Sequence, residues 1–104
     1  MRIAIPAANS TIDSPVDDRF GRCPYFCVYN SDNRETTFLE NTYKGGSGGV
    51  GPQVAEFLAN NHIQKIMAIE IGPKAMDLLN RLNIKTEIIS NGLTIQKVID
   101  TLNL

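Results

Sequence analysis

Two glycine–proline pairs, Gly51-Pro52 and Gly72-Pro73, each stand at the start of a segment with helical periodicity. The N-terminus of a helix presents unpaired backbone N–H groups and a partial positive charge, and a glycine lets a ligand approach the backbone. Lys74 adds a positively charged side chain beside the second pair. These features predict a site for an anionic ligand at two helix starts. The alternative is that each pair is only a favourable way to begin a helix.

A glycine-rich segment, residues 44–52, precedes the first of these helices and contains the pattern G-x-G-x-x-G over Gly46–Gly51. Glu70 lies near the offset at which dinucleotide-binding folds place an acid that binds the ribose. Residues 41–45 separate the motif from the preceding predicted strand, whereas the dinucleotide fingerprint follows its strand directly. Binding of a nucleotide or another phosphorylated small molecule at this loop is therefore the alternative use of these glycines.

A long polar stretch, residues 7–23, is expected to form a loop. Loops of this length within a compact domain carry function or are disordered. Its acids, Asp13, Asp17 and Asp18, are expected to pair with its arginines rather than to hold a metal. The residues expected to contact an anionic ligand are Arg19, Arg22, Gly48, Gly49, Gly51, Gly72 and Lys74.

The two cysteines, Cys23 and Cys27, have different expected roles. Cys23 follows Gly21-Arg22 at the end of the polar loop, and nearby positive charge lowers a thiol pKa and favours a metal-binding thiolate. We therefore expect Cys23 to be the metal ligand, if the chain has one. Cys27 lies within a predicted strand and is expected in the core, because free cysteine is among the most buried residue types.

Catalytic groups are scarce in this sequence. Its single histidine, His62, follows Asn60-Asn61 outside the predicted helix and is expected to be an exposed loop residue. No serine–histidine–carboxylate or cysteine–histidine arrangement can be assembled around it. A binding protein is therefore expected rather than an enzyme.

The elements that must position these residues follow from composition and periodicity. Alternating or β-branched and aromatic segments predict strands, and apolar residues spaced at i, i+3, i+4 and i+7 predict helices. Pro6 is expected to end the first strand. The predicted strands are residues 2–6, 25–29, 36–39, 65–69 and 85–89, and the predicted helices begin near Pro52, at Pro73 and after Thr94.

This order, β-β-β-α-β-α-β-α, indicates an α/β fold with a hairpin meander followed by βαβ crossovers. We expect a five-stranded mixed sheet flanked by three helices, with antiparallel strands at one edge. The helix starts should then gather at the carboxyl edge of the strands, where open α/β sheets bind ligands.

Length and composition limit the class of protein. A chain of 104 residues with 42% hydrophobic residues suits a single domain spanning residues 1–104. Its formal charge of −1 argues against nucleic-acid or anionic-membrane binding, and it has no apolar run long enough to cross a bilayer. Without a secretory signal and with only 2 cysteines, a cytoplasmic address is expected.

Five stretches of the chain resemble the dinitrogenase iron-molybdenum cofactor biosynthesis family, the small NifX-like proteins. The stretches are residues 1–6, Asp13-Ser14-Pro15-Val16, residues 20–26, Gly48-Gly49-Val50-Gly51-Pro52-Gln53 and Ile71-Gly72-Pro73-Lys74-Ala75. They occur in order over nearly the whole chain. The resemblance implies a ribonuclease-H-like fold used without nuclease chemistry, since the first strand offers Ile3 and Ile5 where a two-metal nuclease needs an acid.

The same resemblance implies a small carrier or accessory protein of metallocofactor assembly for nitrogen fixation. Its cargo would be an iron–sulfur or iron–molybdenum cluster or a precursor, and its partners would be assembly or recipient proteins. Metal–sulfur clusters are anionic, so this function agrees with the anion site predicted from the residues. The alternatives are the phosphorylated ligand described above and a regulatory domain that acts through protein contacts alone.

Overall fold

The structure is a computed structural model that describes residues 1–103. It contains five strands and three helices in the predicted order, which confirms the α/β fold class. The ribonuclease-H-like label stays a prediction. In chain order the elements are β1 (Arg2–Ala7), β2 (Tyr25–Asn30), β3 (Glu35–Glu40), α1 (Val50–Asn60), β4 (Lys65–Ala68), α2 (Pro73–Arg81), β5 (Lys85–Ile88) and α3 (Ile95–Leu102).

The strands form one mixed sheet with the order β3-β2-β1-β4-β5. β1, β2 and β3 pair antiparallel, whereas β1–β4 and β4–β5 pair parallel. β3 runs parallel to β1 because both are antiparallel to β2. The carboxyl ends of β1, β3 and β4 therefore lie at the same edge of the sheet, where the connections to α1 and α2 begin.

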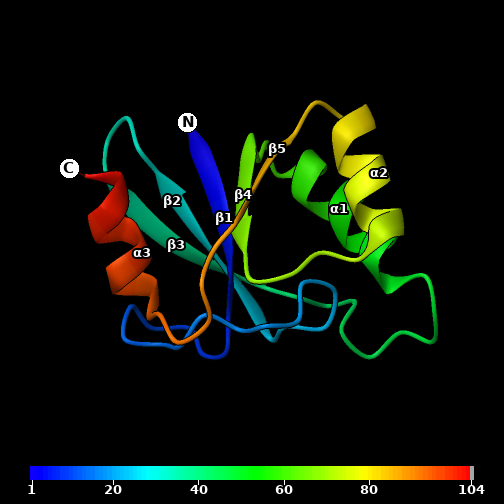
Figure 1. Cartoon of the computed structure of the whole chain (residues 1–104), viewed down its shortest axis with the longest axis horizontal. Coiled ribbons are helices and arrows are strands. Elements are labelled where there is room, and N and C mark those ends of the chain that lie inside the picture. Colours follow the sequence, from blue (N-terminus) through cyan, green and yellow to red (C-terminus); the bar gives the residue numbers. More distant parts are fainter. Residues whose placement is uncertain (104) are drawn as a thin grey trace.

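Each face of the sheet has its own hydrophobic core, because successive side chains of a strand point to opposite faces. Helices α1 and α2 cover one face, and α3 covers the other (Figure 1). On the first face, Ala4, Val28 and Ile66 pack against α1 and α2. On the second face, Ile5 and Tyr29 are among the residues that pack against α3.

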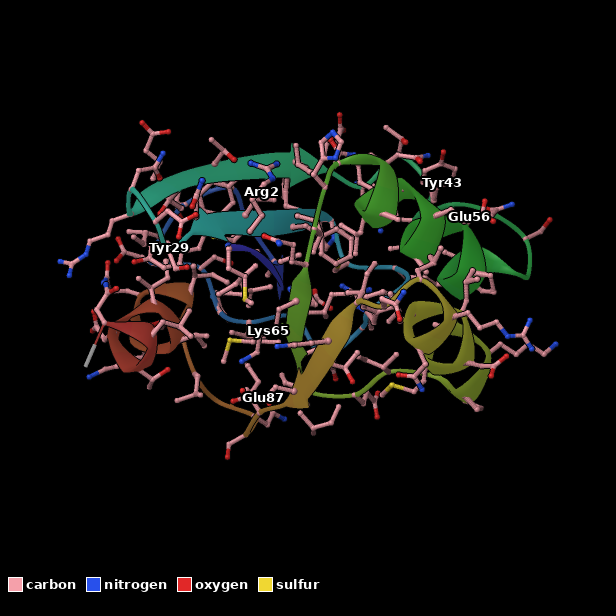
Figure 2. All side chains as sticks on the ribbon, turned by 90° about the horizontal axis from the view of Figure 1, so that it is seen from above. Arg2, Tyr29, Tyr43, Glu56, Lys65 and Glu87 are labelled. Carbon is pink, nitrogen blue, oxygen red and sulfur yellow. The ribbon has the colours of Figure 1, made fainter. Side chains whose placement is uncertain are left out.

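Figure 2 shows side chains at two places on the second face, one beside α3 and one at β4 and β5. Tyr29 lies beside α3, and its hydroxyl group is 2.6 Å from the Asn103 Oδ1 atom. Lys65 of β4 and Glu87 of β5 form an ion pair of 2.8 Å at the β5 edge of the sheet. The second face is thus apolar beneath α3, and an ion pair lies beside the edge strand β5.

The prediction that Pro6 ends the first strand is wrong, because β1 continues through Pro6 to Ala7. A proline within a strand removes a donor from the ladder. Here β4 pairs only with Ile3 and Ala4, so the far end of β1 is free to pair with the loop instead. The Pro6 carbonyl accepts a hydrogen bond from the Asp17 N–H at 2.9 Å.

The long polar loop between β1 and β2 is ordered by its neighbours. Val16 forms a β-bridge to Ala7, and Pro15 forms another to Thr94 just before α3. Backbone hydrogen bonds of 2.9 Å also join Val16 to Leu93 and Ile95 to Ser14. The start of α3 therefore holds the loop against the end of β1.

Candidate functional site

Three segments that are distant in the sequence enclose one cleft with a volume of about 840 Å³. Residues 18–22 of the ordered loop form one wall, the start of α1 at residues 49–52 forms the second, and residues 70–75 between β4 and α2 form the third. This arrangement confirms that the two Gly-Pro helix starts meet at the carboxyl edge of the sheet.

Both helix starts present their backbone to the cleft without a side-chain cap. Gly49 is the N-cap of α1 and Gly72 is the N-cap of α2, and neither helix has a side-chain hydrogen bond at its cap or an acid in its first turn. α1 begins at Val50, slightly before the predicted start, because Gly49 adopts the left-handed conformation that turns the chain into the helix. The partial positive charges of both helices are therefore left without an anionic side chain.

The positions of the cleft that hold glycine do so for different structural reasons. Gly49 has a φ of 61°, which favours glycine whatever its surroundings. A Cβ atom on Gly51 would lie 3.1 Å from the Ala75 Cβ, so this glycine lets α1 and α2 approach each other. Gly72 has a φ of −63° and nothing within 4 Å of its ideal Cβ position. Neither backbone conformation nor packing requires glycine at position 72, where the missing side chain leaves open space.

Three cations and two acids line the cleft. Arg19 is held by Asp17 through an Nη2–Oδ2 contact of 2.8 Å, and the Arg22 Nη1 atom donates to the Lys44 carbonyl at 2.9 Å. Lys74 is exposed and makes no ion pair within residues 1–103. The acids are Asp18 and Glu70. With Arg19 largely compensated by Asp17, the charges of the side chains balance closely and the uncapped helix starts add positive potential.

The expectation that Cys23 is an accessible, acidic thiol is wrong. Cys23 is 0% exposed and belongs to the core beneath α1 and α2. Its Sγ atom lies 3.5 Å from the Phe20 carbonyl oxygen, to which the thiol donates. Burial raises the pKa of Cys23 to about 12, with a further increase from the charge of Asp17, so the thiol is neutral at ordinary pH. In this conformation Cys23 is not available as a metal ligand.

Cys27 is a core residue, as predicted. It is buried on the face of the sheet covered by α3, whereas Cys23 belongs to the core on the opposite face. Burial raises the pKa of Cys27 to about 12 as well. The two thiols therefore share no site, and no group of three histidine, cysteine or acidic residues within residues 1–103 could hold a metal ion.

The cleft brings together six of the seven residues expected to contact an anion. They are Arg19, Arg22, Gly49, Gly51, Gly72 and Lys74. Gly48 does not line the cleft, and its φ of 71° shows that it serves the turn before α1 instead. His62 is exposed, as expected.

Sequence reasoning missed Gly21 as a wall of the cleft. A Cβ atom on Gly21 would lie 3.4 Å from the Gly51 N atom, so the loop passes directly over the start of α1. No local pattern marks this contact, because it depends on how the whole loop is anchored.

The G-x-G-x-x-G motif does not occupy the position of a dinucleotide fingerprint. It follows β3, an edge strand with antiparallel pairing, and residues 41–49 separate that strand from α1. The fingerprint requires a tight turn between a parallel strand and its helix.

The sequence of this chain matches a known protein family. The family described as dinitrogenase iron-molybdenum cofactor matches residues 1–103. An uncharacterized protein of Methanocaldococcus jannaschii is 37% identical over 87 residues, which are 81% of this chain and 70% of that protein. No helix within residues 1–103 is long and apolar enough to cross a membrane.

Solved structures agree with the family match. The apo form of the orange protein from Desulfovibrio gigas has a TM-score of 0.92 and 29% identity, covering 98% of this chain and 86% of that one. A Thermotoga protein described as a candidate NifB protein has a TM-score of 0.83 and 30% identity over the same shares of the two chains. The chain described here therefore belongs to the dinitrogenase iron-molybdenum cofactor family.

Proposed function

We propose that this protein binds an anionic metal–sulfur cluster, or a precursor of one, as cargo during metallocofactor assembly. The observation that carries the proposal is that two uncapped helix starts converge on one cleft of about 840 Å³, where their positive potential adds to side-chain charges that otherwise balance. Backbone N–H groups at helix starts bind anions, and positively charged side chains strengthen such sites. The cargo would be an iron–sulfur or iron–molybdenum cluster.

The two comparisons support a cofactor-related ligand. The family is described by the iron-molybdenum cofactor of dinitrogenase, and the structure of one relative, the orange protein, is described as its apo form. Because Cys23 is buried and neutral, we propose that this chain holds its cargo by hydrogen bonds and charge rather than by a thiolate. Such capture suits a carrier or accessory protein, not an enzyme, that passes its cargo to assembly or recipient proteins.

Gly72 offers a test in which stability and binding should change in opposite directions. Gly72→Ser supplies a side-chain cap to α2, which should raise the free energy of unfolding by roughly a few tenths of a kcal/mol. The same side chain enters the open space beside the helix start and should weaken binding of tetrathiomolybdate, a simple molybdenum–sulfur dianion, about tenfold or more. Anaerobic titration monitored by visible absorbance measures the binding, and urea unfolding measures the stability.

Gly45→Ser is the matched control, because Gly45 also has nothing within 4 Å of its ideal Cβ position but lies outside the cleft. This control should bind the anion like the wild type. Reconstitution with iron, sulfide and molybdate extends the test to larger clusters, and titration with ATP tests the phosphorylated-ligand alternative. If the wild type binds neither tetrathiomolybdate nor a reconstituted cluster, or if Gly72→Ser binds equally well, the proposed site is wrong.

A further inference from the structure

Asp17 is a buried acid next to the cleft, but it does not line it. Its side chain is 6% exposed, and a buried carboxylate is costly unless its oxygens receive hydrogen bonds. Arg19 supplies three, from its backbone N–H at 2.8 Å, from Nε at 3.0 Å and from Nη2 at 2.8 Å. The hydrogen bonds from Arg19 lower the pKa of Asp17, so the carboxylate is charged at neutral pH.

The position of Asp17 is itself fixed by the sheet. Its backbone N–H donates to the Pro6 carbonyl at 2.9 Å, and the preceding residue, Val16, bridges to Ala7. The carboxylate is thus attached to the end of β1, and the Arg19 guanidinium is attached to the carboxylate by two parallel hydrogen bonds. Such bidentate contacts fix the plane of a guanidinium as well as its position.

Arg19 lines the cleft and its side chain is 58% exposed. The Asp17 contacts use Nε and Nη2, while Nη1 has no hydrogen-bond partner within residues 1–103 and keeps its donors for a ligand. Lys74, by contrast, is exposed on the cleft wall without any ion pair in the same part of the chain. A side chain that is already ordered loses less conformational entropy when a ligand binds.

We propose that Asp17 is a positioning residue, which holds the Arg19 guanidinium at the rim of the cleft so that its remaining N–H groups are directed at an anionic ligand. This inference rests on the proposed function of the cleft. It makes Arg19 a directional donor more than a source of net charge, because the Asp17 carboxylate compensates the charge of the guanidinium.

The variant Asp17→Asn distinguishes positioning from charge by the sign of its effect. It removes one negative charge beside the cleft, so an effect of charge alone would tighten the binding of an anion. If Asp17 acts by positioning, the substitution should weaken tetrathiomolybdate binding by about three- to tenfold, because the Arg19 side chain must then be ordered by the ligand. Asp18→Asn is the control for charge: Asp18 is exposed, lines the cleft and forms no ion pair within residues 1–103, so this variant should bind the anion more tightly than the wild type.

Two further measurements separate positioning from a general effect on the loop. In an Arg19→Gln background, Asp17→Asn should cause no further loss of affinity, whereas a loop role of Asp17 would still reduce it. NMR of the arginine Nε–H groups tests the contact without any ligand. The Arg19 Nε–H should exchange with water more slowly than that of exposed Arg34, and Asp17→Asn should abolish the difference.

The outcomes keep this inference separate from the proposed function. Failure of the wild type to bind the probe contradicts the cleft as an anion site, while the NMR experiment still tests the Asp17–Arg19 contact. Unchanged or tighter binding by Asp17→Asn overturns the positioning role even if the cleft binds anions. Equal exchange rates for Arg19 and Arg34 in the wild-type protein overturn it as well.

Discussion

Packing determines the chemical state of Cys23 more than its charged neighbours do. The sequence places this thiol just after Arg22, a context that lowers a thiol pKa when the sulfur is exposed. In the folded chain the sulfur lies in the core, and the nearby guanidinium of Arg19 is already paired with Asp17. Desolvation of the thiolate, together with repulsion by the Asp17 carboxylate, outweighs the hydrogen bonds that favour the thiolate, and the pKa of Cys23 rises to about 12.

Cys23→Ala should therefore leave tetrathiomolybdate binding within about twofold of the wild type, since a change below about 0.4 kcal/mol is expected when no direct contact is lost. The burial of both thiols also gives a prediction for their reactivity.

In the native protein at pH 8, a thiol reagent such as DTNB should modify neither Cys23 nor Cys27. Both should react after unfolding in guanidinium chloride, which provides the control. Rapid native modification, or loss of binding in Cys23→Ala, would show that the sulfur is reachable.

The same pKa values give a prediction for alkaline stability. The pKa of each cysteine is raised from 9.0 in the unfolded chain to about 12 in the folded protein. Between about pH 9 and pH 12 the unfolded chain loses these protons while the folded protein keeps them, so stability falls as pH rises. Urea unfolding at pH 8 to 10.5 should show a smaller decrease for the double variant Cys23→Ala, Cys27→Ala than for the wild type.

At the scale of the elements, periodicity and composition were sufficient to predict the order and type of all eight. The errors lie at boundaries that depend on neighbours. Pro6 continues β1 because the loop around Asp17, and not β4, pairs with that end of the strand. α1 begins at Val50 because the preceding glycine adopts a left-handed conformation, which sequence alone does not require.

Leu79 of α2 is 0% exposed and lies in the core beneath α1 and α2. Leu79→Ala should lower the free energy of unfolding by about 2–5 kcal/mol, because it removes packed methyl groups and leaves a cavity. Leu82, at the end of the same helix, is 38% exposed and serves as the control. Leu82→Ala should cost less than about 1 kcal/mol in urea unfolding, and equal losses for both variants would contradict the observed packing of α2.

At the scale of the molecule, the convergence of the helix starts was predictable because it follows from strand direction. The carboxyl edge of β3 and β4 must carry the starts of α1 and α2, and Gly51 and Gly72 mark those starts in the sequence. The wall formed by residues 18–22 of the loop was harder to predict from the sequence. The loop reaches the cleft because the start of α3 anchors it through backbone hydrogen bonds, and backbone contacts leave little trace in side-chain patterns. Pairing of Asp17 with an arginine was predicted from the sequence, but its burial and its attachment to β1 depend on the same backbone contacts.

Since residues 18–22, 49–52 and 70–75 come together only in the folded chain, the unfolded chain has no comparable cleft. A ligand that binds only the folded form shifts the folding equilibrium by mass action, which amounts to about 2.7 kcal/mol when the free ligand is at a hundred times its dissociation constant. For a chain of this size, that shift should raise the midpoint of thermal unfolding by about 10 °C or more. Differential scanning calorimetry with and without tetrathiomolybdate measures it, and a probe that binds but leaves the midpoint unchanged must also bind the unfolded chain. The dependence of the midpoint on ligand concentration therefore reports the affinity of the folded cleft for its ligand.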